Sequence, residues 1–425
     1  MAEIVSSNVS NSLTDGYGRR SLNLSAAVVG GRGAGVEIGS VNRLVDRGIL
    51  ADRRLADASL GGFEFLVSTM GRVEDIIGGV GDTNSISARI VNVEAALIDA
   101  ASDPSSDVRL MSLGTSLKDL ANGLNAASRD IQSLRVDADT AISGQVDQLN
   151  LSLSQVEQLN KDITSARLSG IDPSGLMDQR QVVIDKIAEI VPIRELDRDN
   201  GQVALMTPSG ETLLDDGIGK LSGGTLGAAF QTRDVELVST QNGLDEIAAD
   251  LISRFQNPAV DPTLVAGQEG LFTDGGAAYD PVNLSGLSGR ISLNALVDPA
   301  QGGASTNLRD GLNSVTPGAS GDATLLQALS AALSSPMASG LDLTLQSAAG
   351  RASNFEASTG AHRLNFEAEL SFSNARWSSL KEAEAAGGVD TDYEMQMLLR
   401  VEQAYAANAR VVQTVESLMQ RLMEI

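Results

Sequence analysis

The chain has 425 residues and a formal net charge of −24 at pH 7. Hydrophobic residues make up 42% of the chain but aromatic residues only 3%, so Ala, Leu, Val and Ile fill most of its interior. A chain this acidic is not expected to bind nucleic acid or anionic membranes, because that binding needs clustered Lys and Arg. The chain has no cysteine, so it has neither disulfides nor thiolate metal sites.

Length and composition favour packed long helices. A chain of this length exceeds the size of one hydrophobic core, so we expect two or three domains. We predict a mainly α fold with smaller β parts, because Ala-rich seams suit helix packing. The single histidine, His362, leaves little for catalysis. The negative charge suits a chain that stays soluble before it meets partners, or it is the general acidity of a bacterial surface.

The N-terminal region carries turn and strand signals. Residues 1–11 lack the basic start and apolar stretch of a cleaved signal peptide, so we expect any export to use another route. No apolar run of about 18 residues is present, so we expect no membrane-spanning helix. Residues 14–17 predict a turn. Two strand-like runs, 21–29 and 36–38, flank the glycine-rich segment 30–35, which predicts a β-hairpin or a flexible loop rather than a nucleotide-binding loop.

One very long helix follows two shorter ones. Ser40 is a suitable N-cap for the first helix, which ends near Ile77, and the second spans about 85–101. Asp103 and the proline after it predict the start of the third. Its apolar residues alternate at spacings of three and four as far as Ala141, and the stripe slips by one residue near Gly144 and resumes as far as Ile163. About 60 residues at 1.5 Å each reach roughly 90 Å, so we expect other helices to pack along it.

The rest of the chain before the last helix alternates between helical and β-like patterns. The expected elements are a helix at 172–191, β-hairpins at 193–230, a helix at 238–255, a small β-rich or irregular insertion at 258–321, and helical periodicity from 323 to 387 with a break near 334–340. The insertion is assigned from its many Gly, Pro, Ser and Asp residues.

The last helix, 391–425, is well specified at its start. Thr391 and Glu394 form a T-x-x-E capping box. Downstream, an apolar stripe with alternating spacings of four and three runs from Met397 to Ile425, and a second row flanks it. So wide a stripe predicts contact with more than one partner helix. The alternative is the closing helix of an ordinary intramolecular bundle.

We predict that this stripe is an assembly interface that packs against partner helices. The proposed interface residues are Leu398, Val401, Tyr405, Asn408, Val412, Val415, Met419 and Leu422. Asn408 lies on the seam, where a buried amide fixes the register and number of partner helices. The alternative is that its side chain reaches solvent through a gap.

Two terminal motifs resemble those of a known family, the axial proteins of the bacterial flagellum. The N-terminal motif consists of Asn8, Asn11, Thr14, Gly16 and Tyr17, with Asp15 where proline is usual. The C-terminal motif consists of Gly388-Val389, acidic residues, and then the sequence Gln-Ala-Tyr-Ala-Ala-Asn-Ala from 403 to 409. Within this family, the long helical segments between 40 and 191 are similar to the hook-filament junction type and unlike rod and hook subunits.

The resemblance implies an arrangement of three layers. Residues 1–36 and 388–425 would form an inner coiled-coil domain, residues 37–257 and 322–387 a helical bundle domain with β-hairpins, and residues 258–321 a small outer insertion. It also implies a structural role, with no enzymatic activity, no cofactor and no metal.

The resemblance further implies a role and a set of partners. Similar subunits form a homo-oligomeric ring at the hook tip, between the hook protein and a second junction protein. They leave the cell through the flagellar type III apparatus and end in the extracellular flagellum, after a transient cytoplasmic stage with a cytosolic export chaperone. Neither nucleic acid nor membrane is an expected partner.

Two departures from the family pattern and two alternatives remain. Only seven residues precede Asn8, where the family has a further helix, so the N-terminus looks truncated or misassigned. The insertion is also short, so we expect an outer domain of longer relatives to be missing. The alternatives are another flagellar axial subunit, such as the second junction protein, a minor flagellin, or a hook or rod protein, and an enzyme housed in the insertion.

Overall fold

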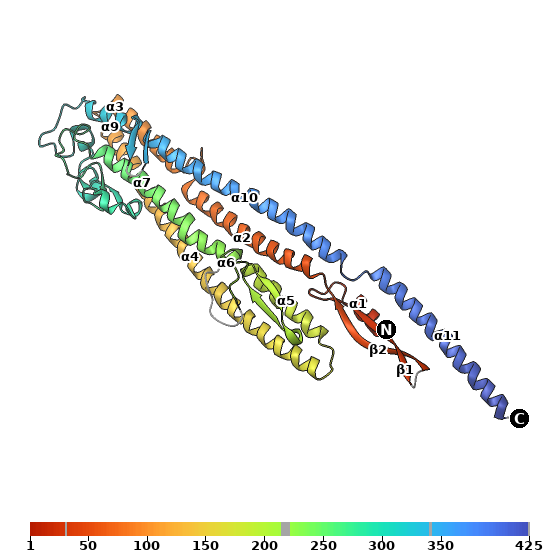
Figure 1. The fold of residues 1–425 in the computed structure, drawn as a ribbon. Helices are drawn as coiled ribbons and strands as arrows, with labels where there is room; N and C mark the ends of the chain where they lie inside the picture. The colour runs from red at the N-terminus through yellow and green to blue at the C-terminus, as the bar shows by residue number, and fades with distance from the viewer. Residues whose placement is uncertain (30–31, 214–221, 340–341, 424–425) are drawn as a thin grey trace. The chain divides into compact units, whose positions relative to one another are not determined.

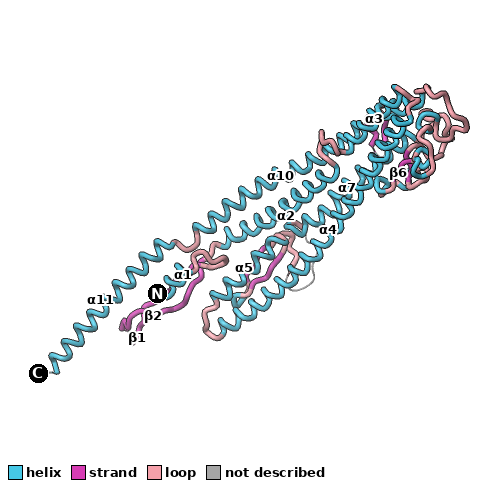
Figure 2. The backbone as a smooth tube through the Cα atoms, turned by 180° about the vertical axis from the view of Figure 1, so that it is seen from behind, coloured by secondary structure: helices cyan, strands magenta, loops and turns pink. Residues whose placement is uncertain are grey.

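The computed structural model describes residues 1–29, 32–213, 222–339 and 342–423. It confirms the prediction of a mainly α protein with small β parts. Long helices dominate, and the described strands form separate two-stranded sheets (Figure 2). Four residues of predicted elements lie outside the described residues. They are Gly30 and Gly31 of the predicted hairpin, Gly340 of the predicted break and Ile425 at the end of the last helix.

Contacts divide the chain into two compact units. Unit 1 comprises residues 1–63, 143–227 and 370–425, and unit 2 comprises residues 64–142 and 228–369. These boundaries cut across the long helices, so the three-layer division implied by the resemblance stays a prediction.

The helices of eight or more residues, labelled in Figure 1, have the following bounds: α1 (Ala2–Ser10), α2 (Arg47–Ile77), α3 (Ile86–Ser102), α4 (Asp107–Leu168), α5 (Ser174–Ile190), α6 (Gly224–Gln231), α7 (Leu237–Phe255), α9 (Thr324–Ser334), α10 (Ala348–Ala386) and α11 (Thr391–Met423). The short α8 spans Asn307–Asp310.

The strands of the described chain form four antiparallel pairs: β1 (Arg19–Val29) with β2 (Arg32–Leu44), β3 (Arg194–Asp197) with β4 (Val203–Met206), β5 (Phe272–Asp274) with β6 (Ile291–Leu293), and β7 (Met337–Ser339) with β8 (Asp342–Gln346). The first pair confirms the predicted N-terminal hairpin, and its strands are longer than expected. The second pair turns at Asn200 and Gly201, which both have positive φ.

Helix α4 confirms the predicted long helix. It runs for 62 residues without a break, passing through Gly144. Its apolar stripe is buried, from Leu110 through Leu134 and on to Ile163. In unit 2 this stripe packs in one core with residues of α2, α3, α7 and α9 and of the 258–321 insertion. Burial of that stripe holds a helix that would be unstable alone.

Two predicted helix starts are wrong. Ser40 lies in β2, because the pairing with β1 continues as far as Leu44. Helix α2 instead starts after Asp46, whose Oδ1 accepts hydrogen bonds from the backbone N–H groups of Gly48 (2.9 Å) and Ile49 (3.1 Å). The Asp103-Pro104 pair forms a separate turn, and α4 begins four residues after Asp103.

The middle of the chain differs from prediction at one hairpin. Helix α5 matches the predicted helix at 172–191, and Asp172 accepts hydrogen bonds from the backbone N–H and hydroxyl of Ser174. Gly223 and Gly224 do not form a hairpin turn but lead into α6, because Gly224 packs directly on the Ile190 carbonyl. Part of the predicted hairpin region, 214–221, lies outside the described residues.

The 258–321 segment holds one short strand pair, the short α8 and four single-turn 3-10 helices, and is otherwise irregular. Buried carboxylates tie its backbone down. Asp245 on α7 accepts hydrogen bonds from the backbone N–H groups of Gly286 (2.7 Å) and Ser288 (2.9 Å). Asp261 accepts one from the Leu312 N–H at 3.0 Å. Side-chain acceptors therefore replace the regular ladders that this segment lacks.

Candidate functional site

The N-terminal motif folds into a network within unit 1, where α1, the β1–β2 hairpin and α5 meet. Asn8 is buried, and its amide pairs with the backbone of Arg20 in β1. Its Nδ2 donates to the Arg20 carbonyl at 2.9 Å, and its Oδ1 accepts from the Arg20 N–H at 3.0 Å. The Tyr17 hydroxyl donates to the same Oδ1 at 2.9 Å. Asn8 therefore fixes α1 to the first residues of the hairpin.

Asn11 and Thr14 shape the turn that joins α1 to β1. The Asn11 Nδ2 donates to the Ser7 carbonyl at 2.9 Å and closes the end of α1. The Thr14 hydroxyl donates to Asn11 Oδ1 at 3.3 Å, and the Thr14 carbonyl accepts from the Tyr17 N–H at 3.1 Å. These local bonds satisfy backbone groups that the helix end leaves without partners.

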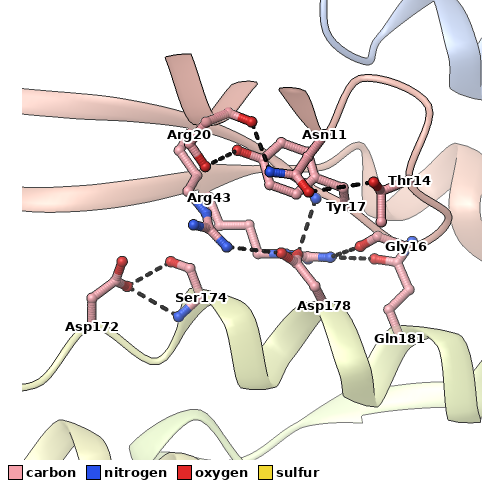
Figure 3. A network of polar contacts seen from close by, with 12 residues as sticks. Asn11, Thr14, Gly16, Tyr17, Arg20, Arg43, Asp172, Ser174, Asp178 and Gln181 are labelled. Carbon is pink, nitrogen blue, oxygen red and sulfur yellow. Dashed lines mark hydrogen bonds and ion pairs between the residues drawn. The ribbon is translucent and has the colours of Figure 1, made fainter. Parts of the chain in front are cut away.

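Gly16 has to be glycine for two reasons. Its φ of 74° lies in the left-handed region. A Cβ at this position would lie 2.6 Å from Val182 Cγ2 and 3.0 Å from the Asp178 carbonyl oxygen, both on α5. The turn of the motif therefore packs directly on the α5 backbone, as Figure 3 shows for Gly16 and Asp178.

Asp178 on α5 is the centre of this network. Its carboxylate accepts from Arg43 Nε at 2.6 Å, from Arg20 Nη2 at 3.0 Å and from the Gly18 N–H at 3.0 Å. Arg43 also donates to the Gly16 carbonyl and to Gln181 (Figure 3). One carboxylate thus ties both strands of the hairpin to α5, in charge-assisted bonds with little exposure.

A second ion pair fixes the first turn of α11. The Glu394 side chain is 3% exposed, and its Oε1 accepts from Arg19 Nε at 2.8 Å. The Arg19 guanidinium also lies over the Tyr393 ring, 5.2 Å from its centroid. The predicted capping box is therefore wrong. Glu394 pairs with Arg19, and Asp390 caps the helix by accepting from the Tyr393 N–H at 3.0 Å.

Beyond its second turn, α11 is bare. Leu398 and Val401 are half-buried. From residue 402 to 423 every side chain is exposed, including Asn408 on the seam. The larger apolar residues of the predicted interface are between 54% and 78% exposed: Tyr405, Val412, Val415, Met419 and Leu422. Figure 1 shows α1 and the hairpin beside the first half of α11, and no described element along its last turns.

Sequence reasoning found the motif but missed the side chains that anchor it. These are Arg19, Arg20, Arg43, Asp178, Gln181 and, in its role as an ion-pair partner, Glu394. The two arginines that follow Gly18 were a usable signal for carboxylate partners. Arg20 pairs with Asp178, 158 positions away, and Arg19 with Glu394, 375 positions away. One sequence gives no means of pairing such distant charges.

The described residues hold no group of three or more His, Asp or Glu side chains that could bind a metal ion. His362 is 58% exposed on α10, with its Nδ1 3.7 Å from Glu236 Oε2. None of the described helices is both long and apolar enough to cross a membrane. The arrangement around the terminal motif offers binding and orientation rather than a catalytic group.

Comparison with known proteins supports the resemblance drawn from the motifs. Residues 70–219 match the family model described as the flagellar hook-associated protein FlgK helical domain. The chain is 26% identical over 223 residues to flagellar hook-associated protein 1 of Bacillus subtilis strain 168, covering 49% of this chain and 43% of that protein. It is 24% identical over 221 residues to the protein of the same name from Escherichia coli K12, covering 49% and 39%.

A third relative, flagellar hook-associated protein 1 of Salmonella typhimurium LT2, is 24% identical over 259 residues, covering 59% of this chain and 46% of that protein. The matches therefore span less than half the length of each of these relatives. The flagellar hook junction protein FlgK from Burkholderia pseudomallei is a similar solved structure, with a TM-score of 0.45 and 18% identity, covering 54% of this chain and 47% of that one. That similarity is too low to argue from.

These matches confirm the predicted resemblance to flagellar hook-associated protein 1 among the flagellar axial proteins. The match to the helical domain begins in α2 and extends through α4 and α5.

Proposed function

We propose that this chain is a structural subunit of the bacterial flagellum that forms a ring at the hook tip and joins hook to filament. The proposal is supported by the match of residues 70–219 to the FlgK helical domain. It is also supported by relatives that are each named flagellar hook-associated protein 1. The single observation that carries it physically is the bare apolar stripe of α11.

A stripe of this length needs a partner. Full burial of a Val, Leu or Met side chain contributes about 1.5–3 kcal/mol, and residues of this kind recur from Val411 to Leu422 at 54–71% exposure. Exposed apolar surface of this extent marks an interaction site or an aggregation hazard. A homo-oligomeric ring would cover the stripe with the same helix of neighbouring copies, in one repeated contact.

In this proposal, the network around Asp178 fixes the orientation of the helix that carries the α11 stripe. Asn8 holds α1 on the hairpin, and Gly16 packs the turn of the motif on α5. The Arg19–Glu394 pair holds the first turn of α11 against the same hairpin. Two chain ends that are fixed together could enter a common inner layer in a defined orientation. In this proposal the terminal motif is a positioning device, and the α11 stripe is the contact surface.

The proposed partners follow from the junction role. They are other copies of this chain, the hook protein, the second junction protein and a cytosolic export chaperone that covers the stripe before type III export. The mature location is the extracellular flagellum. No enzymatic activity is part of the proposal.

Deletion of the gene followed by electron microscopy of the cells tests the function. The expected result is bare hooks and flagellin lost to the medium, with filaments restored by the wild-type gene. Normal filaments on the deletion strain would contradict the junction role.

A double substitution tests the stripe itself. Changing Tyr405 and Val412 to Asp should abolish ring assembly or chaperone binding, because two charges would be buried in each apolar contact. Ala406→Asp with Gln413→Asp is the matched control, with the same spacing on α11 but outside the stripe. Both variants should keep the far-UV circular dichroism of the wild type. Normal assembly of the first variant would remove the stripe as the interface.

A further inference from the structure

Unit 1 contains a partly enclosed cavity of about 100 Å³. It lies between β2, the start of α2, α5 and β3. Four arginines and two carboxylates contribute to its wall: Arg43, Arg47, Arg54, Arg180, Glu195 and Asp197. Such a concentration of guanidinium groups is unusual in a chain with a formal net charge of −24.

Arg54 presents a hydrogen-bond donor without an acceptor. Its side chain is 3% exposed. Its Nε donates to Asp185 Oδ1 at 2.7 Å and its Nη1 to Glu195 Oε2 at 2.6 Å. The third nitrogen, Nη2, is buried and has no hydrogen-bond partner. A buried charged donor left in this state is costly.

Arg180 is a buried cation. The residue is 5% exposed, and it forms no ion pair with any residue that the structure describes. Its Nη1 donates to Asn160 Oδ1 and to the Gly201 carbonyl, each at 2.7 Å. Burial is the main cause that lowers its pKa to about 10. The charge of Glu195 acts against this shift, and those of Arg43, Arg167 and Arg47 act with it.

The carboxylates of the cavity already have cationic partners. Glu195 is bonded to Arg54, and Asp197 pairs with Arg47 at the exposed rim. Asp178, just outside, is occupied by Arg20 and Arg43. An anion in the cavity would lie among the arginine side chains that line it, Arg180 included, and fork-shaped donors of this kind match the oxygens of phosphate and sulfate.

We propose that this cavity is a binding site for a small inorganic oxyanion of the phosphate or sulfate class. Its volume admits several water molecules or one such ion. Water alone would leave the charge of Arg180 without a counter-ion. The site depends on neither the junction role nor the α11 stripe.

Titration of the purified full chain with inorganic phosphate tests the site. Phosphorus NMR should show broadening of the phosphate signal, and thermal unfolding should show a rise in Tm that saturates at millimolar phosphate, because the ligand binds the folded chain. Sodium chloride at matched ionic strength and pH should produce neither effect. If phosphate and sulfate leave both signals unchanged, water fills the cavity and the proposal is wrong.

Variants separate binding from general salt effects. Arg180→Lys keeps a charge but loses the fork, and Arg180→Met loses both, so each should weaken phosphate binding by about tenfold or more. Arg47→Gln, at the exposed rim, should weaken phosphate binding several-fold. This variant keeps the test decisive if the Arg180 variants do not fold. Arg72→Gln, an exposed ion-pair residue in unit 2, is the matched control and should bind as the wild type does. Equal affinity in the wild type, the Arg47 variant and every Arg180 variant that folds would assign the effect to salt and overturn the proposal.

Discussion

Helices α4 and α11 carry the same sequence pattern in opposite environments. Both have apolar residues at alternating spacings of three and four. In α4 the side chains of Leu110, Leu117 and Leu124 have no exposed surface. In α11 the corresponding stripe is bare beyond its second turn, with Tyr405 78% exposed. The difference teaches that such periodicity encodes a helix and a seam, whereas the rest of the chain decides whether anything covers the seam.

The polar contacts of the two helices differ in the same way. Along α4, Lys118 pairs with Asp298 at 2.9 Å, and Asn125 donates to the carbonyls of Ser288 and Ile291. Along α11, the corresponding anchor is the Arg19–Glu394 pair in the first turn. The first helix is held along its length, and the second is held at one end.

The largest expected effect comes from truncating a side chain in the buried apolar stripe of α4. Leu117→Ala should destabilise the chain by about 2–5 kcal/mol, since it leaves a cavity in the unit 2 core. Val415→Ala on the bare seam should change the free energy of unfolding by less than about 0.5 kcal/mol. Urea unfolding of the free chain measures both. A similar cost for the two substitutions would mean that the α11 seam is already covered.

The next effect concerns the anchor of the terminal motif. Asp178→Asn should cost about 1–3 kcal/mol, because Arg20 and Arg43 lose their shared carboxylate in a largely buried site. Hydrogen exchange should accelerate in α1 and in the β1–β2 hairpin and stay unchanged in the α4 core. Asp147→Asn, an exposed position of α4 in the same unit, is the control. Unchanged exchange in the hairpin would show that Asp178 does not hold it.

Gly16→Ala should destabilise the turn of the motif by about 1–2 kcal/mol through its positive φ, and the contact with Val182 adds to this. Gly210→Ala is the matched control, since Gly210 also has a positive φ but has no atom within 4 Å of the point where a Cβ would stand. Denaturant unfolding of both variants separates the two contributions. A Gly16 variant no less stable than the Gly210 variant would argue against the close contact with α5.

The smallest expected effect is the pH dependence of the ion pair between Lys118 on α4 and Asp298. Hydrogen bonds from Gln301 and Lys118 lower the pKa of Asp298 from 3.8 to about 2. A lowered folded pKa means that this carboxylate stabilises the chain above about pH 4 and loses that contribution as pH falls towards 2. Asp298→Asn should therefore cost less than about 1 kcal/mol at pH 7, because Lys118 is half exposed. The stability difference should shrink at acid pH, and a constant difference would contradict the ion pair.

The sequence predicted the long helices well because their signals are local and repeated. Helix α4 and the N-terminal hairpin were recognised from spacing and turn residues alone. Predicted helix starts failed at Ser40 and Asp103, where strand pairing and a local turn override a suitable capping residue. The motif at Asn8 to Tyr17 was found, but not its partner Asp178, because the pairing of charges across that distance depends on the fold.

Hydrogen exchange measured by mass spectrometry over residues 402–423 tests the central claim most directly. In the free chain these amides should exchange fast, as in a helix whose seam has no partner, while the α4 amides from 110 to 134 stay protected. In the assembled ring the 402–423 amides should become protected. Strong protection of this segment in the free chain, or equally fast exchange in the ring, would contradict the assignment of α11 as the contact surface.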